Sequence, residues 1–274
     1  MQPDFSLSYL TTAELTPPEA VTVAAQAGYR YAGVRMLPSV PGGLAFPLMN
    51  DPAMLRETQA RIADTGVGVF DIEIIRLGPD TNVAAFEPFL EAGGRLGART
   101  VLVAGDDTDE ARLTERFAAL CDLGRPYGLT MDLEFMPFSA VRDLAAAMRI
   151  VGGADRDNGG ILVDALHFDR SASSFEDLAK VPRQWLHYLQ ICDAPAEQPK
   201  TIEEMIHTAR AERLRPGEGG LDLVAIFAAL PRDVPVSIEV PTLELAKTVS
   251  AVERAALARE AAARVLAALP PERT

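Results

Sequence analysis

Short β-branched segments alternate with longer segments of helical periodicity along the whole chain, and this alternation limits the fold more than any other feature. Eight such pairs follow one another, from "FSLSYL" before "PPEAVTVAAQAG" to "VPVSIEV" before an Ala-rich stretch. Repeated strand-then-helix units are typical of a parallel sheet covered by helices. Eight units also suit closure into a barrel with functional residues at the carboxyl ends of its strands. We therefore expect an α/β fold, a single (β/α)8 TIM barrel.

Length and composition agree with one barrel. Such a barrel takes about 250 residues, and no Ser/Gly linker or low-complexity segment divides the 274 residues, so we expect one domain over 1–274. No apolar run is long enough to span a bilayer, and no basic leader precedes an apolar stretch, which predicts a cytoplasmic protein without a membrane partner. The net charge of −13 argues against a nucleic-acid partner, because phosphate binding needs a basic face.

Polar residues interrupt the apolar pattern of the later strands, at positions where a barrel interior is usually apolar. In "LTMDLEFMP", Asp132 and Glu134 share one face, and the apolar residues between them should face the helices. The same alternation turns Asp164, Gln190 and Glu239 inward at the ends of the next three strands. Carboxylates that converge in a half-buried site repel one another unless a cation neutralises them. We therefore predict one divalent metal ion there, whereas the alternative is that each acid pairs with an arginine at the rim.

Five segments carry a resemblance to a known family. Over essentially the whole chain, the sequence resembles the sugar phosphate isomerase/epimerase superfamily of xylose isomerase-like TIM barrels, through "LEFMP", "ILVDALHF", "YLQICDAP", "PGEGGLD" and "SIEVP" in this order. The resemblance implies a metal site like that of 3-dehydroshikimate dehydratases, with Glu134, Asp164, Gln190 and Glu239 as ligands. Many relatives have histidine in place of Gln190, within a pattern like "HIKD". The bacterial 3-dehydroshikimate dehydratases of the superfamily are similar to this chain in having glutamine there.

The ligand set indicates which metal to expect. Three carboxylates and an amide form an all-oxygen set, which favours Mn²⁺, Mg²⁺ or Co²⁺ over Zn²⁺. Endonuclease IV resembles this fold but uses a histidine-rich zinc site on DNA, and three histidines with a charge of −13 argue against that reading. His167 has left its strand three residues after Asp164, so we expect it to hang over the site and shuttle protons. Strand alternation places His187 toward the helices, in a structural role.

Further candidates for substrate binding lie at the ends of the early strands. Arg35 follows strand two, and Glu73 and Arg76 lie on strand three, so all three should face the same mouth of the barrel.

The 25-residue stretch after strand seven is longer than usual for a βα loop, and such loops are often functional. We expect a helix over 201–212 with Arg210 and Arg213 in water, and substrate contacts from Arg215 and from Glu218 of "PGEGG".

The chemistry expected of this site is metal-assisted proton abstraction next to a carbonyl, with Glu134, Glu239 and His167 as catalytic residues. The substrate would be a small polyhydroxylated carbonyl compound, neutral or anionic, and the leading interpretation is a sugar, sugar phosphate or sugar acid isomerase/epimerase. A lyase of the 3-dehydroshikimate or inosose dehydratase type is the runner-up, and a non-catalytic ligand-binding barrel is the third interpretation. The last helix, roughly 243–269, is long enough for a homodimer contact, although a plain outer helix is the simpler expectation.

Overall fold

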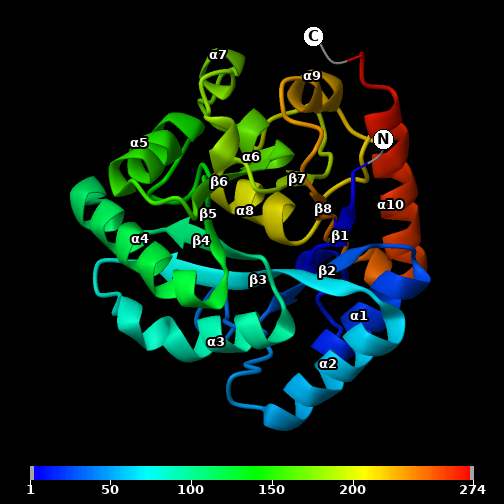
Figure 1. Ribbon diagram of the computed structural model, residues 1–274. Helices are drawn as coiled ribbons and strands as arrows, with labels where there is room; N and C mark the ends of the chain where they lie inside the picture. The colour runs from blue at the N-terminus through cyan, green and yellow to red at the C-terminus, as the bar shows by residue number, and fades with distance from the viewer. Residues whose placement is uncertain (1–2, 272–274) are drawn as a thin grey trace.

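The strands of this computed structural model, which describes residues 3–271, form a closed parallel barrel (Figure 1). Each strand pairs with the next along the chain, and β8 closes the barrel against β1. The strands are β1 (Phe5–Leu7), β2 (Tyr31–Arg35), β3 (Gly68–Leu77), β4 (Thr100–Gly105), β5 (Thr130–Glu134), β6 (Gly159–Asp164), β7 (Leu189–Ile191) and β8 (Val236–Ile238). The α/β barrel predicted from the alternation is confirmed.

Helices follow the strands and surround the barrel (Figure 1). Many begin at a side chain that accepts a backbone N–H, as Asp109 does for α4 and Ser250 for α10. The described α-helices are α1 (Pro17–Gln26), α2 (Pro52–Thr65), α3 (Glu87–Leu96), α4 (Glu110–Gly124), α5 (Leu144–Ala154), α6 (Ala165–Arg170), α7 (Phe175–Leu178), α8 (Ile202–Arg210), α9 (Leu223–Ala228) and α10 (Ala251–Ala267). The last helix is therefore shorter than the expected 243–269. Among these helices, none combines the length and apolar character needed to cross a membrane.

Two apolar layers hold the barrel. The larger layer lies between strands and helices and contains Met131, Leu133 and Phe135, as the alternation in β5 predicted. A smaller cluster fills the barrel interior, where the tilted rings of Phe70 and Tyr188 pack with their centroids 5.3 Å apart. Burial of this kind is worth about 25 cal/mol per Å² of apolar surface. Because the strands are packed on both faces, the polar residues at their carboxyl ends are held in fixed positions.

The expected orientation of His187 is wrong. Its Nδ1 lies 2.8 Å from Oδ1 of Asp132, which is fully buried on the inward face of β5. His187 precedes the first residue of β7 by two positions, so strand alternation does not set its direction. Gly160 leaves room for the pair, because a Cβ there would lie 2.5 Å from both His187 Nδ1 and Asp132 Oδ1.

The His187–Asp132 pair should make stability depend on pH. Burial lowers the pKa of His187, but the Asp132 carboxylate and its hydrogen bond outweigh this effect, so the pKa is raised. A raised folded-state pKa adds stability that is complete below the unfolded value of about 6.5 and is lost as pH rises through the folded value. We expect His187→Gln to lose more unfolding free energy, relative to the wild type, at about pH 5.5 than at about pH 9. Urea unfolding at both pH values measures this, and an equal loss at the two would contradict it.

The segment between β7 and β8 is fastened to the barrel by Asp193. Its backbone pairs with that of Leu214 through two N–H···O bonds of 2.8 Å, so the ends of the α8 segment meet. The Asp193 carboxylate accepts the backbone N–H groups of Gly217 and Gly219 at 2.9 and 3.0 Å. A Cβ at Gly219 would lie 2.3 Å from the Asp193 carboxylate, which explains glycine at this position. The "PGEGG" motif is therefore a turn built around a buried carboxylate.

Candidate metal centre and active site

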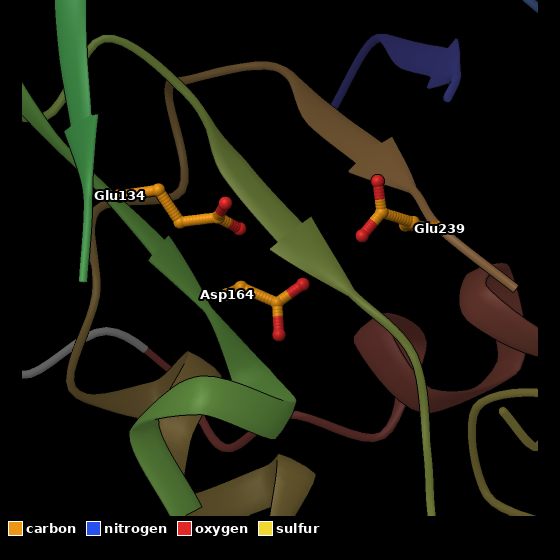
Figure 2. Close-up of side chains that lie close together, drawn as sticks. All are labelled: Glu134, Asp164 and Glu239. Atoms are coloured by element: carbon orange, nitrogen blue, oxygen red, sulfur yellow. The ribbon is translucent and has the colours of Figure 1, made fainter. Parts of the chain in front are cut away.

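Three carboxylates converge at the carboxyl ends of the later strands (Figure 2). Glu134 ends β5, Asp164 ends β6, and Glu239 follows β8. One oxygen from each lies within 4.8 Å of the other two, and all three residues are buried. The structure thus brings together the three acids that strand alternation turned inward.

Two of these carboxylates are fixed by donors of the protein. Oδ1 of Asp164 accepts the backbone N–H groups of Leu166 and His167 at 2.8 and 3.1 Å, because Asp164 caps the N-terminus of α6. Oε1 of Glu239 accepts the hydroxyl of Ser8 at 2.7 Å. These donors fix the orientation of both groups before any ligand binds.

Arg213 also binds these two carboxylates, so the expectation that it lies in water is wrong. Its guanidinium donates to Asp164 Oδ2 and Glu239 Oε2, at 2.7 Å in each case, and its side chain is 1% exposed. Nε donates to the carbonyl oxygen of Ala209 at 2.9 Å, which ties the guanidinium to the end of α8. Arg213 therefore enters the acidic cluster from the loop segment and compensates one of its three charges.

Glu134 differs from its two neighbours in its electrostatics. Burial raises its pKa well above the ordinary value, and the charges of Glu239 and Asp164 add to the effect. Burial also raises the pKa of Glu239 to about 7, although Arg213 opposes the shift. For Asp164, burial is outweighed by Arg213 and neighbouring donors, and the pKa is lowered. Among the described residues, only the Gln190 amide can donate a hydrogen bond to Glu134, so this carboxylate keeps its oxygens available.

Gln190 lies on β7 beside the three acids. One end of its amide is 3.3 Å from Glu239 Oε1, and the other end is 3.1 Å from Asp164 Oδ2 and 3.2 Å from Glu134 Oε1. In the absence of a cation, the amide nitrogen satisfies the last two carboxylates when it points toward them. Turned the other way, the amide oxygen faces the same carboxylate oxygens and completes an all-oxygen donor set.

The donor set fits a divalent cation. When all three carboxylates are ionised, one guanidinium leaves two negative charges uncompensated in this buried site, and a divalent cation would balance them. Glu134, Asp164, Gln190 and Glu239 could hold this cation through oxygen atoms, which suits Mg²⁺ and Mn²⁺. The sequence did not lead us to expect the positive charge of Arg213 in this site. With this charge included, three carboxylates and one divalent cation would form a neutral set.

His167 lies against Glu134, as its position after Asp164 suggested. Its Nε2 is 3.8 Å from Glu134 Oε1, which is too long for a hydrogen bond, and its ring packs edge-on against Phe138. Burial lowers the pKa of His167 to about 4, so the imidazole is neutral at neutral pH. His167 therefore offers one N–H and one lone pair to the site, without a charge.

A cavity of about 190 Å³ opens above these groups and is lined by residues from both halves of the barrel. Its lining includes Arg35, Glu73 and Arg76, which were predicted to face this mouth of the barrel from the ends of strands two and three. Arg35 pairs with Glu73 at 2.6 Å and lies over the Tyr9 ring, 4.3 Å from its centroid. Arg76 forms two hydrogen bonds of 2.6 Å with Asp106. Both arginines are thus held in place by carboxylates.

Arg215 and Glu218 lie elsewhere. They pair with each other at 2.9 Å on the turn that Asp193 holds, and neither lines the cavity. Arg210 and Arg213 line it instead, and both were expected in water. One signal could have identified Arg213 from the sequence. Three inward acids need positive charge beside them, and a nearby arginine can supply it.

A larger cavity, about 880 Å³, lies at the other end of the barrel beside Leu189 and Val236, the first residues of β7 and β8. Within residues 3–271, no group of metal-ligating side chains lies there, and the one such group is Glu134, Asp164 and Glu239. The smaller cavity is therefore the candidate functional site.

Comparison with known families agrees with this architecture. Residues 21–268 match the model of the xylose isomerase-like TIM barrel family. The chain belongs to this family. Inosose isomerases of Bacillus licheniformis and Bacillus subtilis are similar to this xylose isomerase-like barrel, with 30% identity over 174 residues and 26% over 163 residues. The matches cover 60% and 56% of this chain, and 59% and 56% of those proteins. The chain thus spans less than two thirds of the length of these relatives.

Solved structures share the barrel over nearly its whole length. An IolI protein with a bound zinc atom has a TM-score of 0.81 and 20% identity, with 96% of this chain and 98% of that chain covered. The D-psicose 3-epimerase of Clostridium cellulolyticum H10, solved with D-tagatose, has a TM-score of 0.73 and 14% identity, with 96% and 99% covered. At these identities the likeness establishes the fold of the xylose isomerase-like barrel.

Gln190 provides a test of the donor set in this xylose isomerase-like barrel. Gln190→His keeps the neutral charge but replaces an oxygen by an imidazole nitrogen, so metal preference should move toward Zn²⁺ and Co²⁺. Gln190→Glu keeps the oxygen and adds a charge, which should tighten binding of every divalent ion. Competition titrations among Mg²⁺, Mn²⁺, Co²⁺ and Zn²⁺ measure both effects. If both variants only lower the melting temperature and keep the wild-type order of metals, Gln190 is a hydrogen-bonding residue and not a ligand.

Proposed function

We propose that the chain is a divalent-metal-dependent sugar isomerase or epimerase that acts next to a carbonyl group of a small polyhydroxylated substrate. The observation that carries the proposal is the position of Glu134, a buried carboxylate with a raised pKa among acids that fit a divalent cation. The family, and relatives that are inosose isomerases, support the same class of reaction.

The side chains of the site divide the work of such a reaction. A divalent cation held there would polarise the substrate carbonyl and stabilise the negative charge that develops as the neighbouring C–H bond loses its proton. Glu134 takes this proton at its carboxylate, since its oxygens carry few hydrogen bonds. Figure 2 shows Glu239 facing Glu134 from the segment that follows β8, where it can return a proton to the other face of the substrate. Ser8 and Arg213 hold Glu239 in that orientation.

The fate of the proton distinguishes the outcomes that this site can support. Return to the other face gives an epimer, return to the neighbouring carbon gives an isomer, and loss of a β-hydroxyl gives a dehydrated product. A dehydratase of the 3-dehydroshikimate or inosose type is the second candidate, and Arg210 in the lining of the cavity favours it, because 3-dehydroshikimate carries a carboxylate.

One matched assay tests these proposals. The protein loaded with Mn²⁺, Mg²⁺, Co²⁺ or Zn²⁺ is incubated with ketoses, inososes and 3-dehydroshikimate, and solvent deuterium incorporation next to the carbonyl is followed with product formation. The proposal expects metal-dependent exchange and an isomer or epimer. A dehydrated product favours the second candidate. Protein that binds no metal and catalyses no exchange supports a non-catalytic barrel instead.

A further inference from the structure

Among residues 3–271, Arg210 is the cation of the cavity that has no carboxylate partner. It ends α8, lines the cavity and is about half-buried. Its guanidinium lies over the Phe138 ring, 5.7 Å from the centroid, and within residues 3–271 it forms no ion pair with an acid. Burial lowers the pKa of Arg210, and the positive charges of Arg76 and Arg35 lower it further. An arginine nevertheless stays protonated in proteins, so a positive charge faces the cavity.

The other charges of the cavity cancel in pairs. Arg35 is neutralised by Glu73, and Arg76 by Asp106. With a bound divalent cation, which they fit, the three acids at the strand ends would be balanced by that cation together with Arg213. One positive charge, that of Arg210, is then left over in a partly desolvated site. A neutral sugar leaves this charge uncompensated, whereas a substrate with a single negative charge balances it.

We propose that the substrate carries a carboxylate, and that Arg210 binds it at the mouth of the cavity while the carbonyl end reaches Glu134. This inference rests on the proposed function, because it takes the cavity above the acids as the substrate site. Arginine presents a planar fork that matches the two oxygens of a carboxylate. A phosphate carries a charge of about −1.5 to −2 at neutral pH and would exceed the single charge available. The substrate class is therefore a sugar acid or a related hydroxylated keto acid.

Binding of matched sugars tests the inference without turnover. D-glucuronate, D-glucose and D-glucose 6-phosphate differ at one carbon and are titrated by calorimetry into the Mn²⁺-loaded wild type and into the Arg210→Gln and Arg215→Gln variants. We expect D-glucuronate to bind the wild type best. Loss of a hydrogen-bonded charge pair in Arg210→Gln should weaken D-glucuronate binding about 10- to 100-fold and leave D-glucose within about twofold. Arg215→Gln, on the same segment but outside the cavity, should bind all three sugars like the wild type.

Other outcomes separate this inference from the proposed function. Equal weakening of D-glucose and D-glucuronate in Arg210→Gln, or no weakening of either, overturns the carboxylate site, and so does tighter binding of D-glucose 6-phosphate than of D-glucuronate. If neutral ketoses show metal-dependent deuterium exchange that is the same in the wild type and in Arg210→Gln, the proposed function stands and the inference is overturned. Arg210-dependent binding of D-glucuronate in a protein without exchange activity supports the inference and contradicts the proposed function.

Discussion

Replacement of Glu134 by glutamine is expected to lower kcat about 10²- to 10⁴-fold, the range typical of a lost general acid or base. The amide keeps an oxygen for the metal but cannot take a proton. Metal content should therefore stay at about one ion per chain, as elemental analysis would show. Because Glu134 can accept a proton only as a carboxylate, the wild-type rate should fall as pH drops and this group becomes protonated, and the variant should lose that dependence.

Glu218→Gln is the matched control for this substitution. Glu218 is exposed on the turn after Arg215 and lies outside the cavity, so the same chemical change there should leave kcat within a factor of about two. If Glu134→Gln keeps wild-type turnover, Glu134 is not the proton acceptor, and Glu239 would be assigned this role instead. A variant that loses its metal instead would show that the charge of Glu134 is needed for binding.

Arg213→Met should destabilise the metal-free protein by about 3–5 kcal/mol at neutral pH, the cost of removing one partner from a buried ion pair. The variant leaves Asp164 and Glu239 buried without their shared cation, beside Glu134. A saturating divalent ion restores positive charge at this cluster, so much of the loss should be recovered when Mn²⁺ is added. Urea unfolding with and without Mn²⁺ measures both quantities.

The same substitution at Arg215 serves as the comparison. Its pair with Glu218 is partly exposed, and such pairs contribute about 0–1 kcal/mol. We expect Arg215→Met to remain close to the wild type in both conditions. Equal stability of the two variants without metal would mean that Arg213 does not compensate the acidic cluster, and a large loss that Mn²⁺ leaves unchanged would point to packing of the arginine stem instead.

The barrel was predictable because each of its repeating units is visible locally. The β-branched runs and the helical periodicity mark strands and helices, and eight repeats suit closure. The same local rule turned Glu134, Asp164 and Glu239 inward, because side chains on a strand alternate between two faces and parallel strands end at the same side.

Side chains outside the strands were not predictable in this way. His187 lies before β7, and its direction is set by Asp132 rather than by alternation. Arg213 and Arg215 are two residues apart in a loop segment, yet the first is buried among acids and the second pairs at the surface. Which of the two arginines is buried depends on the three-dimensional arrangement of Asp193, the turn that it holds and the acids. The sequence therefore located the acids and missed the arginine that balances them.

The paired backbone of Asp193 and Leu214 makes the α8 segment a closed lobe whose two ends are joined at its base. A lobe of this kind can change in length or composition at little cost to the rest of the chain, since the entropic cost of closing a loop grows slowly with its length. Grafting experiments can therefore exchange residues 196–210 between related barrels while Arg213 and the strand-end acids stay. Specificity would then be transplanted separately from the catalytic chemistry, because Arg210 lies within the exchanged lobe and the proton-transferring carboxylate lies outside it.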